Sequence, residues 1–71
     1  MKIINCGRVI YVLTAHHIAT IVYDYNNGGQ PSAHIYYDGE HGEIVEAMNG
    51  QTLRYAVRLA RWTVREKEYL D

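Results

Sequence analysis

The last third of the chain constrains the fold most, because residues 51–69 contain neither glycine nor proline. Within this run, apolar residues recur three and four positions apart, which is the spacing of one face of an α-helix. These residues are Leu53, Ala56, Val57, Ala60 and Val64. The small side chains of Ala56 and Ala60 would let the helix lie close to a sheet. The sequence therefore predicts a helix over residues 51–69, with Asn49 as its N-cap.

Two upstream segments are typical of strands joined as a hairpin. Residues 8–14 are rich in β-branched and aromatic side chains, which favours a strand. We expect residues 2–5 to begin the same strand, with Gly7 marking a bulge or bend. A turn at residues 15–16 would lead into a return strand over residues 17–25, whose side chains alternate between two faces.

The middle of the chain indicates a second hairpin. Residues 26–31 combine Asn, Gly and Pro and are expected to form a loop. Residues 32–38 follow as a strand, and residues 39–42 as a four-residue hairpin loop. Residues 43–48 fit either a fourth strand or a short helical turn. The expected fold is α+β, one domain over residues 1–71, with a three- or four-stranded antiparallel β-meander and one C-terminal α-helix packed on a face of the sheet.

A second set of residues follows the helical period beside the apolar stripe. Four arginines lie within roughly 60° of one another on a helix surface; this arginine row is Arg54, Arg58, Arg61 and Arg65. A third face carries Tyr55, Leu59, Trp62 and Tyr69. Guanidinium groups bind carboxylates and phosphates in a bidentate manner, and Arg, Trp and Tyr dominate protein-binding hot spots. We expect a partner-binding surface made of Arg54, Arg58, Arg61, Arg65, Trp62, Tyr55 and Tyr69.

Two alternatives explain the same residues without a partner. The arginine row could pair within the chain with an acidic segment that carries no lysine or arginine, namely Asp38, Glu40, Glu43 and Glu46. Leu59 and Trp62 could complete the edge of the core. If the core does not cover the third face, this face would contact another chain, and the protein could form a homodimer.

The overall charge limits the class of partner. The net charge is −1, which excludes a generally basic nucleic-acid binder and leaves room for a local basic patch. The chain has seven tyrosines and one tryptophan but no phenylalanine, which favours aromatic side chains on partly solvated surfaces such as binding interfaces. We therefore expect a protein partner with an acidic surface. The alternative is a nucleic-acid-binding module that docks the arginine row on phosphates.

The sequence contains no convincing catalytic or metal-binding pattern. His16 and His17 are adjacent and would point to opposite faces of a strand. His34 and His41 flank an acidic hairpin but match no known metal-ligand spacing. Cys6 is expected to be a buried structural thiol. We therefore expect no catalytic residues, no metal, no cofactor and no enzymatic activity.

The single cysteine excludes an intramolecular disulfide and favours a reducing compartment. With no recognisable signal peptide or membrane-spanning segment, the expected location is cytoplasmic.

In length, in the meander through residues 35–39 and in the helix over residues 52–69, the chain resembles the small intracellular inhibitors encoded by phages and mobile elements, including anti-CRISPR proteins. The resemblance implies an inhibitor that occludes a surface of its target.

Overall fold

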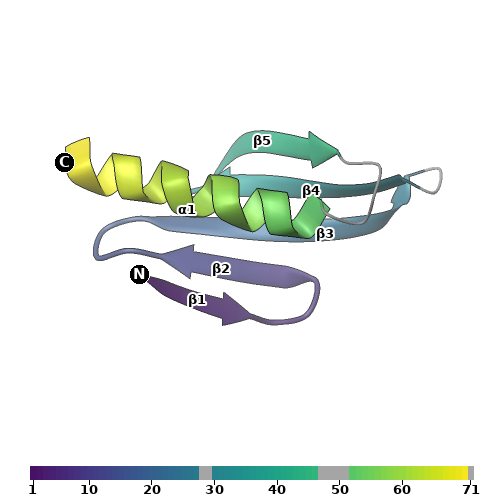
Figure 1. Ribbon diagram of the computed structural model, residues 1–71, viewed down its shortest axis with the longest axis horizontal. Coiled ribbons are helices and arrows are strands. Elements are labelled where there is room, and N and C mark those ends of the chain that lie inside the picture. The colour runs from purple at the N-terminus through teal and green to yellow at the C-terminus, as the bar shows by residue number, and fades with distance from the viewer. Residues whose placement is uncertain (28–29, 47–51, 71) are drawn as a thin grey trace.

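A computed structural model describes residues 1–27, 30–46 and 52–70. The elements are β1 (Lys2–Asn5), β2 (Val9–Leu13), β3 (Ile18–Asn27), β4 (Gln30–Tyr37), β5 (Glu40–Glu46) and α1 (Thr52–Leu70). The strands pair in chain order as one antiparallel sheet, and α1 lies on one of its faces (Figure 1). The α+β meander with one C-terminal helix is confirmed. The predicted number of strands is wrong, because the sheet has five rather than three or four.

The additional strand is β1. Gly7 has a φ of 81°, a conformation that glycine adopts without steric cost, and its amide donates to Asn5 Oδ1 at 2.9 Å. The Cys6 amide donates to the Val9 carbonyl at 2.8 Å and closes the turn. Residues 2–5 therefore reverse and pair with β2 instead of leading into it. Cys6 is exposed in this turn, so the expectation of a buried thiol is wrong.

The turn between β4 and β5 is also tighter than the sequence predicts. Asp38 and Gly39 have φ angles of 52° and 86°, and two consecutive positive values suit the tight hairpin turns that match sheet twist. Strand β5 therefore begins at Glu40, without the four-residue loop expected at residues 39–42. Residues 43–46 are strand, and residues 47–48 lie outside the described part of the chain.

The two predictions around residues 26–31 and Asn49 have different outcomes. Strand β3 extends to Asn27 and β4 starts at Gln30, so the predicted loop is shorter than its sequence suggests. The ladder changes register between Asp24 and Asn27, which absorbs the extra residues. The N-cap assigned to Asn49 lies outside the described residues. Helix α1 starts at Thr52, close to the predicted start.

The core lies between α1 and the concave side of the sheet. Strand register aligns Ile10, Ile21 and Ile35 on this side. The buried apolar residues are Ile10, Val12, Ala19, Ile21, Tyr23, Ala33, Ile35, Tyr37, Val45, Ala56, Ala60 and Val64. The centre of the predicted apolar stripe is therefore confirmed as the packed face of the helix.

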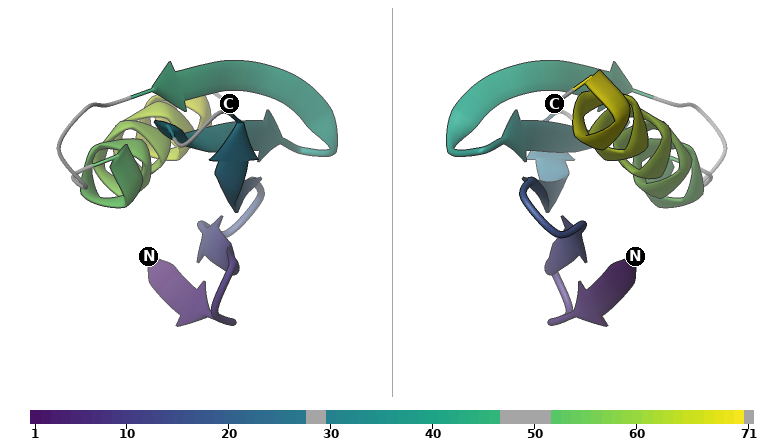
Figure 2. Two further views of the ribbon diagram at one scale, coloured as in Figure 1. Left: turned by 90° about the vertical axis from the view of Figure 1, so that its right-hand side faces the viewer. Right: turned by 90° about the vertical axis from the view of Figure 1, so that its left-hand side faces the viewer.

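The sheet is wider than the helix that covers it. Figure 2 shows α1 in the curve formed by β3, β4 and β5, while β1 extends beyond it. All four residues of β1 are exposed. Leu53 and Val57, at the side of the predicted stripe, are only half-buried. The core side of β1 is consequently left open beside the helix.

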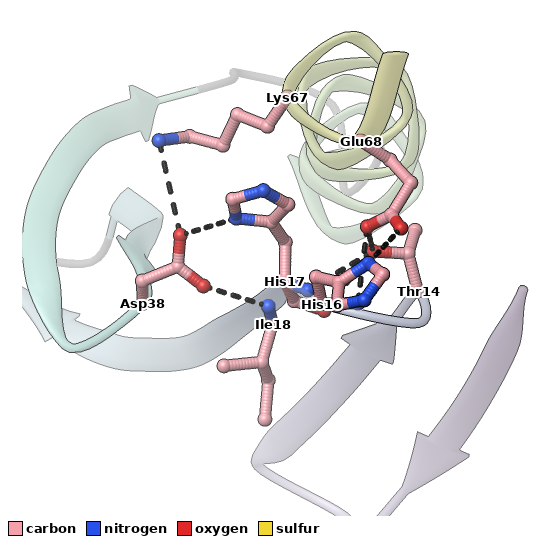
Figure 3. Close-up of polar contacts among 7 residues, drawn as sticks. All are labelled: Thr14, His16, His17, Ile18, Asp38, Lys67 and Glu68. Atoms are coloured by element: carbon pink, nitrogen blue, oxygen red, sulfur yellow. Dashed lines mark hydrogen bonds and ion pairs between the residues drawn. The ribbon is translucent and has the colours of Figure 1, made fainter. Parts of the chain in front are cut away.

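A carboxylate on α1 ties the C-terminal end of the helix to the β2–β3 turn. Glu68 Oε2 accepts hydrogen bonds from Thr14 Oγ1 at 2.8 Å and from the His16 amide at 3.0 Å (Figure 3). Its other oxygen, Oε1, lies 2.5 Å from His16 Nδ1. These bonds lower the pKa of Glu68, with the His16 side chain as the largest cause.

Asp38 makes a second clamp beside the first (Figure 3). Its Oδ2 lies 2.8 Å from His17 Nδ1, and its Oδ1 accepts the Ile18 amide at 2.9 Å. Lys67 Nζ of α1 is 3.9 Å from Asp38 Oδ2. The pKa of Asp38 is lowered, first by the His17 hydrogen bond and then by the Ile18 amide. The two clamps fix the direction of α1 across the sheet, and thereby the position of the arginine row.

We expect these clamps to make the fold sensitive to acid. A carboxyl group whose pKa is lower in the folded state stabilises the fold above its unfolded pKa, and this contribution disappears as the pH falls through the folded value. The ordinary values are 3.8 for Asp38 and 4.5 for Glu68. The melting temperature of the parent should exceed that of Asp38→Asn/Glu68→Gln at pH 6, and the difference should shrink as the pH falls below these ordinary values. A difference that is constant from pH 6 to pH 3 would contradict the assignment.

Candidate functional site

The arginine row is solvent-exposed along its whole length: Arg54, Arg58, Arg61 and Arg65. Within residues 1–27, 30–46 and 52–70, none of the four forms an ion pair with a carboxylate. Asp38 is held by His17 and Lys67 instead. The described residues therefore do not support the alternative in which the arginine row pairs with the acidic segment. Among the described residues, the four guanidinium groups are therefore exposed and have no carboxylate partner.

A groove lies between α1 and the β1–β2 hairpin, directly beside this row. It has a volume of 570 Å³. Its lining residues are Ile3, Asn5, Ile10, Leu53, Arg54, Val57, Arg58 and Arg61. The strand residues and the half-buried side of the helix supply an apolar floor, and three arginines supply one wall. The groove exists because a single helix does not cover a five-stranded sheet.

The arginine row also borders two further hollows. One, of 170 Å³, lies between Arg58, Arg61, Trp62 and Arg65. The other, of 590 Å³, lies at the C-terminal end of α1 and is lined by Met1, Thr14, Ala15, Arg65, Glu68 and Tyr69. Together with the groove, they follow the flank of α1 from its first turn to its last.

The third face of the predicted helix divides into two parts. Leu59 is half-buried and packs against the core, so it does complete the core edge as one alternative proposed. Tyr55, Trp62 and Tyr69 are exposed by 54%, 60% and 90%. They recur every seven residues, and we call them the aromatic row. Trp62 lies about 100° around the helix from Arg61, so the aromatic row lies beside the arginine row; Trp62 and Tyr69 border the two further hollows but do not line the groove.

The partner-binding residues predicted from the sequence thus form two adjacent surfaces, one arginine-lined and one aromatic. Sequence reasoning missed the strand residues of the groove: Ile3, Asn5 and Ile10. Ile3 and Ile4 are β-branched and favour a strand, but only the pairing of this strand with β2 brings Ile3 to the groove. Leu53 and Val57 were assigned to the core; they are half-buried and pack against it, and they also line the groove at its margin.

The opposite face of the sheet is covered by no element of the described chain. It carries Val9, Tyr11, Leu13, Ile18, Val22, His34, Tyr36, His41 and Ile44. The His41 ring packs edge-on against His34 and Tyr36, with centroid separations of 5.7 and 5.0 Å. These histidines therefore make ring contacts within the sheet face.

The described residues show neither a cluster of metal-ligating side chains nor a membrane-spanning helix. In the described part of the chain, no three His, Cys, Asp or Glu side chains gather in a way that could hold a metal ion. The His17–Asp38 and His16–Glu68 pairs bond to neighbouring backbone amides and hold the fold together. The described helix is not long and apolar enough to cross a membrane.

No family model, curated protein sequence or solved structure matches the chain. The surface that the fold creates around α1 is therefore the basis for assigning a function.

Proposed function

We propose that this is a small macromolecule-binding protein, a protein–protein interaction module or inhibitor that acts by occluding a surface of its target. The binding surface is the arginine row with the aromatic row beside it. The observation that carries the proposal is the exposure of all four arginines without a carboxylate partner in the described residues. The expected partner is a protein with an acidic surface, and no catalytic step is involved.

The residue types suit such a surface. Arginine offers a planar fork of donors that matches carboxylates in a bidentate manner. Trp62 and Tyr55 provide large contact areas with few rotatable bonds to immobilise. A helix clamped at its C-terminal half by Asp38 and Glu68 presents these side chains in fixed positions. The surface is therefore organised before binding, which reduces the entropy lost on association.

Nucleic acid is the second candidate, favoured by the same unpaired guanidinium groups. Phosphate binding would produce affinity that falls steeply with salt concentration. Against it, Glu66 and Glu68 lie in the C-terminal turns of the same helix, and the exposed Glu40, Glu43 and Glu46 give the β4–β5 hairpin a negative charge. A protein partner is favoured by the exposed Trp62 and Tyr55 beside the arginine row, because these residue types dominate protein-binding hot spots.

The test is affinity capture from nuclease-treated lysate with the parent and with two folded variants, Arg58→Glu/Arg61→Glu and Trp62→Ala. We expect the double reversal to abolish capture of a partner that the parent retains, because two attractive charge pairs become repulsive. Trp62→Ala should weaken capture by about 2 kcal/mol, the cost typical of a hot-spot residue.

Arg58→Lys/Arg61→Lys is the matched control, since it keeps the charge and removes the forked geometry. Binding that depends on bidentate contacts should weaken in this variant but persist. If the reversal and Trp62→Ala both capture the same partner as well as the parent does, the surface of α1 is not the binding site. Capture that disappears with nuclease would favour the nucleic-acid alternative.

A further inference from the structure

The groove beside α1 has the position of a missing element in the helical layer. Helix α1 packs on β2, β3, β4 and β5, while β1 extends beyond it and has no element above its core side in the described part of the chain (Figure 2). Helices packed side by side on a sheet lie about 8–10 Å apart. The open strip over Ile3 and Ile10 is therefore next to α1, in the same layer.

The lining of the groove defines the chemistry of an occupant. Its floor is apolar, with Ile3 exposed by 45% and Ile10 almost fully buried. Val57 and Leu53, one helical turn apart, form the lower part of the α1 wall. Above them the wall is cationic along its whole length, formed by Arg54, Arg58 and Arg61. An occupant needs an apolar face toward the sheet and carboxylates on the flank next to α1.

We propose that the groove receives an amphipathic, acidic α-helix from a partner protein, which packs beside α1 over β1. This inference rests on the proposed function and specifies the partner. The arginines at i, i+4 and i+7 match carboxylates repeated at the same period on an adjacent helix. From Leu53 to Arg61 the wall extends about 12 Å, which is roughly two helical turns.

A helix fits this position better than an added strand does. A strand pairing with the free edge of β1 would lie in the plane of the sheet, beyond Lys2–Asn5. There it would contact neither Val57 nor Arg61, which stand above the sheet on α1. A helix in the upper layer contacts the strands and the arginines together. It would also bury Ile3, Leu53 and Val57, which one helix alone leaves partly exposed.

The probe for the experiment is a synthetic helical peptide of about 18 residues, or five turns. One face carries leucines at i, i+3, i+4 and i+7, and one flank carries glutamates. Two control peptides replace the glutamates with lysines or introduce a central proline that breaks the helix. Binding to the intact protein is measured by fluorescence anisotropy at low and moderate salt.

The protein variants separate the groove from the rest of the surface. Ile3→Glu places a negative charge on the groove floor without changing α1. Ile44→Glu is the matched control, because Ile44 is an exposed isoleucine on the other edge strand, at 54%, and it pairs with His34 on the open face of the sheet. We expect Ile3→Glu to weaken binding of the acidic helix by tenfold or more and Ile44→Glu to change it less than twofold. Arg58→Glu/Arg61→Glu should abolish binding, and both control peptides should bind at least tenfold more weakly.

Each contrary result identifies which proposal fails. If Ile3→Glu binds the acidic helix as the parent does while Arg58→Glu/Arg61→Glu does not, the groove is not the site and the arginine surface stands. If neither variant differs from the parent, both proposals fail. Equal binding of the proline peptide would overturn a helical occupant. A dimer of the parent in light scattering that Ile3→Glu dissociates would show that a second copy fills the groove, which also overturns the proposal.

Discussion

Val64→Asp should leave the protein unfolded at 25 °C. Val64 is completely buried against the sheet, in the same stripe as Ala56 and Ala60. An aspartate there would be an uncompensated charge in an apolar core, which costs several kcal/mol. A core of this size supplies only about 3–5 kcal/mol in total. Circular dichroism should therefore show loss of the helix signal and no cooperative thermal transition.

Tyr69→Asp is the control for this substitution. It introduces the same charge five residues further along α1, at a side chain that is 90% exposed. We expect its melting temperature to fall within a few degrees of the parent value, since exposed substitutions change stability by about 0.5 kcal/mol or less. If Val64→Asp melted like Tyr69→Asp, the packed face of α1 would have been assigned wrongly.

The helix was predictable because its evidence is local. The apolar period of Ala56, Ala60 and Val64 needs no knowledge of the sheet, and it identifies the packed face directly. The same spacing rule places the arginine row on one side of α1. The alternation in residues 17–25 similarly anticipates Ala19 and Ile21 on the core side of β3.

The features of the structure that the sequence did not predict depend on contacts between segments far apart in the chain. The sequence around Gly7 is compatible with either a bulge or a reversal, and only pairing of β1 with β2 distinguishes them. The groove needs Ile3 and Val57 to face each other, and no local pattern relates these two residues. The hydrogen bond of Asp38 is a further example, because its partner His17 lies in the β2–β3 turn, 21 residues earlier in the chain.

The clamps explain why the arginine row stays unpaired in the described residues. Asp38 comes from the acidic segment but is directed to His17, Ile18 and Lys67. Glu68 is close to Arg65 in sequence, yet its oxygens are occupied by Thr14 and His16. The carboxylates nearest to the helix therefore stabilise the fold. The guanidinium groups remain available for another molecule, which is the basis of the proposed function.

Gly42→Ala should destabilise the protein by about 1–3 kcal/mol, the cost of overpacking a core. A Cβ atom at this position would overlap the Tyr37 ring and lie 3.2 Å from the Ile35 carbonyl oxygen. Tyr37 is only 7% exposed, and Lys67 Nζ lies 5.7 Å from its ring centroid. The ring has to move, and the packing beneath α1 moves with it. The melting temperature should fall by about 4–8 °C for each kcal/mol lost.

A double-mutant cycle with Tyr37→Ala shows whether this steric conflict is the cause. Removing the ring is itself destabilising, but it leaves space for the new methyl group. In the Tyr37→Ala background, Gly42→Ala should therefore cost less than about 0.5 kcal/mol, a coupling that only residues in contact display. Gly7→Ala is the backbone control, because Gly7 has a positive φ and nothing lies within 4 Å of an added Cβ. The destabilisation caused by Gly7→Ala should therefore be the same with or without the Tyr37 ring. Equal costs of Gly42→Ala in both backgrounds would refute the conflict with Tyr37 and place the strain in the β5 backbone.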